Sequence, residues 1–170
     1  MSVIGGPLLD TYEHIFHFPK EKAVEAVRIY RAWYADYGIH QAKLYPGIVD
    51  LLRSLKENGV FTGIATLKAE RFAQNMMEEL GVGELFDCIY GMNDKDTITK
   101  SDLVRKCISA VGVKNEETCM IGDSIHDLMG AQLCGTSFIG VNYGFGLHGE
   151  KETTFPICSS PAEIKTKLNI

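Results

Sequence analysis

Polar residues follow short apolar runs in the second half of the chain, at places where chemistry could occur. Thr66 comes directly after the run from Val60 to Ala65, and its hydroxyl and the next amide, that of Leu67, are able to bind a phosphate oxygen. Lys100 stands just before a helical pattern and brings a positive charge. Taken alone, such a threonine is typical of a helix cap and such a lysine of a solvated surface.

Two carboxylates follow a later apolar run, from Cys119 to Ile121. Asp123 and Asp127 are four residues apart, and helix geometry places side chains at that spacing near one another. Magnesium prefers one or two carboxylates, retained waters and phosphate oxygens in an octahedron. The alternative is that both aspartates only cap and solubilise a helix. A threonine, a lysine and paired aspartates in this order favour a site for phosphate and Mg²⁺.

These residues need a scaffold, and from Gly59 onward short apolar strands alternate with amphipathic helices. That pattern predicts an α/β fold with a doubly wound parallel sheet covered by helices on both faces. The expected strands are Val60 to Ala65, Cys88 to Tyr90, Cys119 to Ile121, Ser137 to Val141 and a short one at Phe155 to Cys158. The expected helices are Ala69 to Leu80, Ser101 to Val111 with Ser101 as its cap, His126 to Cys134 and Pro161 to Leu168. Ligands bind beyond the carboxyl ends of such strands, where the polar residues stand.

The first part of the chain is helical in pattern. Asp10-Thr-Tyr-Glu13 has capping-box spacing and predicts a helix start at Asp10. A longer helix is expected from about Pro19 to Tyr37, and its stripe of aromatic and aliphatic residues is expected in the core. Leu44-Tyr-Pro-Gly47 breaks the pattern before a helix from Ile48 to about Asn58. A domain boundary is therefore expected between residues 1–43 and 44–170.

Composition narrows the class of partner. The chain has 170 residues, of which 45% are hydrophobic, and a formal net charge of -5 with no run of basic residues. These features argue against nucleic acid and anionic membranes and favour a small-molecule partner. No apolar run approaches the roughly 20 residues that span a bilayer, so we expect a cytoplasmic protein. The five cysteines and five histidines lack Cys-x-x-Cys and His-Glu-x-x-His spacing, and we assign them no metal.

The motifs together resemble the haloacid dehalogenase superfamily, and in particular its phosphoglycolate-phosphatase-like hydrolases. The segments that carry the resemblance are Ile4-Gly-Gly-Pro-Leu8, Leu44-Tyr-Pro-Gly47, Gly63-Ile-Ala-Thr66, Ile89-Tyr-Gly91, Lys100-Ser-Asp-Leu-Val, Gly122-Asp123 to Asp127, and Gly140-Val-Asn-Tyr-Gly-Phe-Gly146. The resemblance implies a Rossmann-like core over residues 44–170 and a remnant helical cap over residues 1–43. It also implies a small phosphorylated metabolite as substrate and Mg²⁺ as cofactor.

The same resemblance implies a role for each candidate residue. Thr66, with the amide of Leu67, holds the transferred phosphoryl group, and Lys100 neutralises charge on it. Asp123 ligates magnesium, and Asp127 supports the metal or its waters. These roles follow from the family pattern and not from the spacing of the residues.

One family motif is missing from the sequence. Family members open with a strand that ends in Asp-x-Asp-Gly-Thr, whose first aspartate attacks phosphorus, and no such motif occurs here. Asp10 does not replace it, because no apolar strand precedes it and no second aspartate or glycine turn follows. The resemblance therefore implies a truncated and inactive phosphatase. The absent central strand must be replaced by Met1 to Ile4, by direct pairing of its neighbours, or by a segment swapped between the chains of a homodimer.

Three interpretations of function remain open at this point. The first is the truncated phosphatase. The second is a noncatalytic protein that binds phosphate and magnesium or regulates a partner, and the third is an enzyme whose catalytic aspartate comes from a separate polypeptide. Phosphoglycolate itself is a family analogy, which is a weak warrant for the substrate of any one member.

Overall fold

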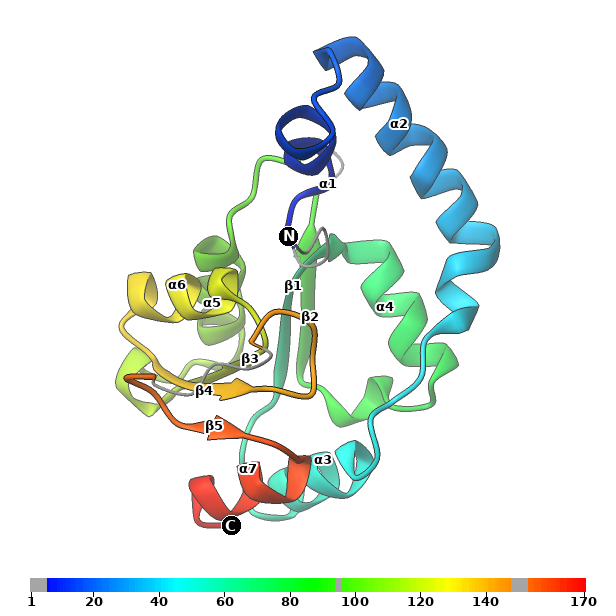
Figure 1. The fold of residues 1–170 in the computed structure, drawn as a ribbon. Coiled ribbons are helices and arrows are strands. Elements are labelled where there is room, and N and C mark those ends of the chain that lie inside the picture. The colour runs from blue at the N-terminus through cyan, green and yellow to red at the C-terminus, as the bar shows by residue number, and fades with distance from the viewer. Residues whose placement is uncertain (1–5, 94–95, 148–152) are drawn as a thin grey trace.

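The computed structural model describes residues 6–93, 96–147 and 153–170, in which helices alternate with parallel strands (Figure 1). The strands are β1 (Gly63–Ala69), β2 (Cys88–Met92), β3 (Cys119–Gly122), β4 (Ser137–Val141) and β5 (Ile157–Cys158). The helices are α1 (Leu8–Asp10), α2 (Lys20–Trp33), α3 (Ile48–Glu57), α4 (Glu70–Glu79), α5 (Lys100–Val111), α6 (Ile125–Cys134) and α7 (Pro161–Leu168). Short helical turns add Thr11–Ile15, Tyr34–Gly38, Ile39–Gln41, Gly83–Leu85 and Asn115–Glu117. The predicted α/β fold with parallel strands is confirmed.

The strands form two parallel sheets. β1 pairs with β2, and β3, β4 and β5 form the second sheet in that order. In the part of the chain that the structure describes, no ladder joins β1 to β3, so direct pairing, one of the three alternatives for replacing the missing strand, is wrong. The proposed strand from Met1 to Ile4 lies outside the described residues, and strand exchange between two chains stays a prediction. Two sheets that share the same covering helices are thus held beside each other without a common ladder.

One helix layer packs on both sheets. Val104 and Ile108 of α5 are buried with Cys134 of α6, and Ala65 of β1 and Met120 of β3 pack against this cluster. α5 packs on β1 and β2, and α6 packs on β3 and β4, so the two helices together cover one face of both sheets.

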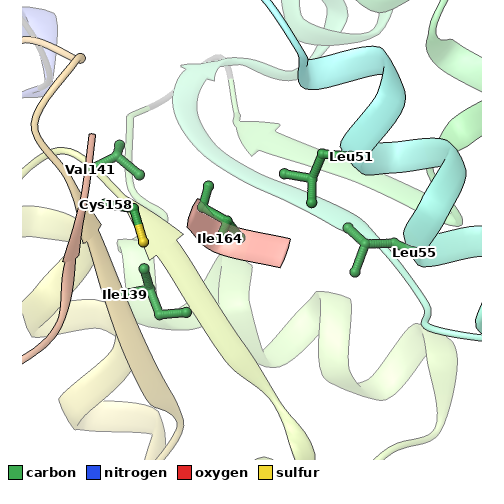
Figure 2. Packing of buried hydrophobic residues seen from close by; sticks show 6 residues of the cluster. All are labelled: Leu51, Leu55, Ile139, Val141, Cys158 and Ile164. Atoms are coloured by element: carbon green, nitrogen blue, oxygen red, sulfur yellow. The ribbon is translucent and has the colours of Figure 1, made fainter. Parts of the chain in front are cut away.

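A second helix layer covers the other face. Figure 2 shows Leu51 and Leu55 of α3 facing Ile164 of α7, with Ile139 and Val141 of β4 beyond it, next to Cys158. Residues Ile139 and Val141 are two apart on their strand, so both point to the same face. Burying each of these aliphatic side chains stabilises the fold by about 1.5–3 kcal/mol.

The N-terminal helices lie at one side of the molecule, where α2 runs past α4 (Figure 1). Tyr34, just after α2, packs its ring on Phe72 of α4 at 5.3 Å between centroids. Val27 is buried, but Val24 and Tyr37 are 53% and 61% exposed, so the expectation that the whole stripe is core is wrong. The structure tests no domain boundary, and the division at residues 43 and 44 stays a prediction.

Two helix caps differ from the prediction. α1 begins at Leu8 and ends at Asp10, whose exposed side chain makes no capping hydrogen bond. α5 is capped by Thr99 and not by Ser101, because Thr99 Oγ1 accepts the Asp102 amide at 3.2 Å. Asp102 Oδ2 accepts the Thr99 amide at 3.0 Å in return. Such a reciprocal pair satisfies two amides at a helix start, and it places Lys100 at the first position of the helix.

Candidate active site

Thr66 lies where β1 leaves its ladder with β2. The parallel register holds through Ala65 opposite Tyr90 and is next restored only at Ala69 opposite Met92. The predicted strand from Val60 to Ala65 is therefore corrected: β1 begins at Gly63 and continues past Thr66 to Ala69 through an irregular stretch. Thr66 Oγ1 accepts the Lys68 amide at 3.1 Å, which leaves the hydroxyl hydrogen to donate to an anion.

Lys100 connects the two sheets at this end. Its Nζ donates to the backbone oxygen of Ala65 at 2.8 Å and pairs with Asp127 Oδ1 at 2.9 Å. The Lys100 and Asp127 side chains are only 13% and 10% exposed. A Cβ at Gly130 would stand 2.5 Å from Lys100 Cγ, so a glycine there lets the lysine stem pass across α6. The lysine is thereby fixed between β1 and α6.

Asp127 is held by the start of α6. Ser124 is the N-cap of this helix, and its hydroxyl and amide donate to Asp127 Oδ2 at 2.6 and 3.1 Å. The other carboxylate oxygen faces Lys100, so both oxygens of Asp127 have partners. A Cβ on Gly122 would stand 2.3 Å from Asp127 Cβ, so this position has no room for a side chain. Asp127 is placed to position Lys100.

Asp123 is held by a glycine-rich loop after β4. Its Oδ2 accepts the amide of Phe145 at 2.6 Å. Cβ atoms at Gly144 and Gly146 would stand 2.2 Å from Asp123 Oδ2 and 2.5 Å from its backbone oxygen. The contacts of the two glycines with Asp123 were not predicted, although the Gly-Phe-Gly spacing was a visible signal.

The predicted residues meet at one cavity. Residues Thr66, Leu67, Lys100, Asp123 and Asp127 all line a cavity of about 1060 Å³ that continues between β1 and β3. Lys100 and Asp127 are in direct contact, while the described bond of Asp123 goes to the loop after β4. The functional roles of these residues stay predictions.

Lys68 lines the same cavity and was not predicted. Its Nζ donates to the Tyr34 hydroxyl at 2.6 Å and lies 4.1 Å from the centroid of that ring. Burial lowers the pKa of Lys68, since a charged amine loses hydration there. Tyr34 follows α2 in sequence, so this contact joins the N-terminal helices to the carboxyl end of β1. An anion bound in the cavity would have both this amine and the Thr66 hydroxyl in its lining.

The carboxylates of Asp123 and Asp127 are the candidate ligands for Mg²⁺ at this cavity. In the described ranges, no three acidic, histidine or cysteine side chains gather as a metal cage. Magnesium bound through one or two carboxylates, waters and phosphate needs no such cage. Asp123 fits this mode, because only one of its oxygens is bonded to the described residues. Asp127 fits as a support, since Lys100 and Ser124 already occupy its oxygens.

The chain is similar to a known family of hydrolases. The family model of haloacid dehalogenase-like hydrolases matches residues 1–141. The 5'-nucleotidase of Pseudomonas aeruginosa is 34% identical over 168 residues, which cover 97% of this chain and 76% of that protein. The crystal structure of a predicted phosphatase from Clostridium acetobutylicum aligns with a TM-score of 0.89 at 30% identity, over 98% of this chain and 79% of that one.

A more distant solved structure shows the fold alone. A protein from Lactobacillus delbrueckii that is provisionally named a phosphoglycolate phosphatase aligns with a TM-score of 0.75 at 24% identity. The alignment covers 88% of this chain and 64% of that chain. The names of these similar proteins differ in substrate, although most name an enzyme that hydrolyses a phosphate bond.

Proposed function

This chain belongs to the haloacid dehalogenase-like hydrolases, and from that premise we propose that its site binds a small phosphomonoester together with Mg²⁺. The family and its phosphatase lineage confirm the prediction from sequence. The observation that carries the proposal is the meeting of a threonine, a lysine and two aspartates from separate elements at one cavity. Such a set has the donors, the cation and the metal ligand that phosphate recognition needs.

Each side chain has a definite task in this proposal. The Thr66 hydroxyl and the Leu67 amide donate to phosphoryl oxygens, and Lys100 neutralises their charge. Asp127 holds Lys100 in place through its 2.9 Å contact, and Asp123 offers a carboxylate oxygen to the metal. Mg²⁺ would add electrostatic stabilisation of the phosphoryl group when bound. Positioning of the reacting groups and stabilisation of their charge provide most of the catalysis of phosphoryl transfer.

The described aspartates do not replace the nucleophile of the missing motif. Asp127 has both oxygens engaged, Asp123 is bonded to the loop after β4, and Asp10 is exposed and does not line the cavity. Loss of a covalent nucleophile costs on the order of 10⁶ in kcat. We therefore expect negligible phosphatase turnover from these 170 residues by themselves.

Two alternatives keep the same binding groups and differ in chemistry. A noncatalytic protein would bind phosphate and Mg²⁺ without turnover, and a complemented enzyme would receive its catalytic aspartate from a separate polypeptide. The contacts of Asp127 with Lys100 and Ser124, and of Asp123 with the loop after β4, are compatible with either. The substrate class stays a small phosphorylated metabolite, and the choice among such metabolites is family analogy.

Hydrolysis of p-nitrophenyl phosphate with Mg²⁺, paired with calorimetric binding of inorganic phosphate, separates these cases. We expect no turnover above background together with phosphate binding that needs Lys100. Lys100→Met should abolish that binding, and Lys106→Met, an exposed lysine of the same helix, should leave it intact. Hydrolysis at ordinary enzyme speed would contradict the proposal that the chain is inactive. Absence of phosphate binding by the unmodified chain would contradict the proposal that these residues form a phosphate site.

A further inference from the structure

Two cysteine thiols from different elements meet beside β1. Cys88 is the first residue of β2, and Cys107 lies in α5, which packs on both β1 and β2. In the parallel register Cys88 stands opposite Gly63 of β1. A Cβ atom at Gly63 would lie 2.9 Å from Cys88 Sγ, 3.4 Å from Cys107 Sγ and 3.5 Å from Cys107 Cβ. The glycine therefore leaves a space into which both sulfur atoms project.

The two sulfur atoms also contact each other. The Cys88 and Cys107 side chains share a hydrogen bond, and both thiols are free. Cys107 Sγ lies 3.4 Å from the backbone oxygen of Ile64, which turns its thiol towards the strands. A disulfide needs Cβ atoms about 3.5–4.5 Å apart and sulfur atoms that face each other. Since thiols that share a hydrogen bond already face each other, this pair is placed to form one.

The other three cysteines are less suited to pairing. The described hydrogen bonds of Cys119 and Cys134 go to backbone oxygens, and Cys134 and Cys158 are buried. Cys88 and Cys107 are half-buried and line the large cavity, so a small oxidant can reach them. Contact and access therefore single out the same pair.

We propose that Cys88 and Cys107 form a reversible modification site, at which hydrogen peroxide oxidises the two thiols to a disulfide that joins β2 to α5. In the first step Cys88 sulfur takes one oxygen of the peroxide and becomes a sulfenic acid, and the other oxygen leaves as water with the thiol proton. Cys107 sulfur then attacks Cys88 sulfur, and its proton leaves with the hydroxyl as a second water. Two thiols and one peroxide thus give one disulfide and two waters.

The two thiols have different roles in this sequence. Burial raises the pKa of both, and for Cys107 burial together with the nearby Cys88 raises it to about 12. The hydrogen bond from Cys107 favours the thiolate of Cys88 and offsets part of the rise there. Because the thiolate is the form that attacks peroxide, Cys88 reacts first and Cys107 resolves the sulfenic acid. The scarcity of thiolate makes the first step slow at neutral pH.

The disulfide would act on the helix that carries Lys100. Lys100 is the first residue of α5, and a covalent bond from Cys107 to β2 fixes this helix on the sheet. It also removes the thiol hydrogen beside the oxygen of Ile64, the residue before Ala65, whose oxygen accepts Lys100 Nζ. The inference rests on the contact of the two thiols and holds whether or not the site binds phosphate.

Peptide mass spectrometry of the full 170-residue chain after treatment with hydrogen peroxide tests the proposal. With remaining free thiols blocked by iodoacetamide, we expect a linked peptide pair that joins Cys88 to Cys107 and is lost on reduction with dithiothreitol. Since the link restricts the unfolded chain, we also expect Tm to rise by about 5–10 °C on oxidation. Cys119→Ser is the matched control and should give the same link and the same rise.

Single variants test the order of the two steps. In Cys107→Ser the sulfenic acid of Cys88 has no resolving thiol, so dimedone should label Cys88 after peroxide treatment. In Cys88→Ser we expect about tenfold or more less label on Cys107, because its thiolate is scarcer. If either variant does not fold, the alanine variant at the same position gives the same comparison.

Several results would overturn the proposal. Sulfenic or sulfinic acid at Cys88 without a link in the unmodified chain would show that the two sulfur atoms cannot bond. A predominant link that involves another cysteine, or one between two chains, would assign the oxidation elsewhere. Thiols that stay unmodified after prolonged treatment would show that peroxide does not reach the pair, and equal dimedone labelling of the two variants would contradict the order of steps.

Discussion

β4 and β3 are neighbours in one sheet, yet their environments differ. β4 lies between two paired strands, whereas β3 has β4 on one side and the cavity on the other. Both are short apolar runs, but four successive residues of β4 are buried and every residue of β3 is half-buried. The difference shows that burial of a strand depends on its neighbours as much as on its own sequence.

The largest effect is expected at the contact that connects the two sheets. Lys100→Met leaves Asp127 buried without its cation, and removing one partner of a buried pair costs about 3–5 kcal/mol. Arg105→Met on the same helix is the control, because the Arg105–Asp102 pair is about half exposed and such pairs contribute about 0–1 kcal/mol. Urea unfolding measures both. Equal losses would contradict a structural role for the Lys100 contact.

A smaller effect on the free energy of unfolding is expected when a side chain of the enclosed strand β4 is compared with one of β1 beside the cavity. Ile139→Ala in β4 removes a side chain that is 5% exposed, and we expect a loss of about 3 kcal/mol in the free energy of unfolding. Ile64→Ala in β1 removes a half-buried side chain that lines the cavity, and we expect about 1 kcal/mol or less. Calorimetric or urea unfolding of the two variants checks the contrast. Similar losses would mean that the cavity side of β1 is as tightly packed as β4.

The smallest expected effect is a change in how the folding stability depends on pH. Cys107 lines the cavity, and burial together with the nearby Cys88 raises the pKa of its thiol from 9.0 to about 12. Between these values the unfolded chain has lost a proton that the folded chain keeps, so stability falls as pH rises from about 9 towards 12. Cys107→Ser should flatten that part of the stability curve, and Ser109→Ala on the exposed side of α5 should not. An unchanged slope in Cys107→Ser would contradict burial of this thiol.

Most of the fold could be predicted from periodicity. The expected helices and strands after residue 44 all form, with ends shifted by a few residues, because each has a clear apolar pattern and a capping or turn residue. The ends were harder to predict, because hydrogen bonds decide them. Thr99, and not Ser101, caps α5, because the side chain of Asp102 accepts a hydrogen bond from the Thr99 amide. Thr66 lies within β1 and not after it.

The candidate site was predictable in its residues and less so in its contacts. Thr66, Lys100, Asp123 and Asp127 line one cavity as the order of motifs indicated. The contact between Lys68 and Tyr34 joins residues 34 positions apart, and sequence periodicity carries no information about such a pair. Direct pairing of β1 and β3 was one of the three ways considered to replace the missing strand, and it does not occur in the described residues, because such pairing depends on tertiary packing that periodicity does not encode.

A crystal structure of this chain with inorganic phosphate and Mg²⁺ tests the central claim most directly. The account predicts phosphate at the Thr66 hydroxyl, the Leu67 amide and Lys100 Nζ, with the metal on an oxygen of Asp123. Phosphate bound elsewhere, or metal held without Asp123, would contradict the claim that these side chains form the functional site.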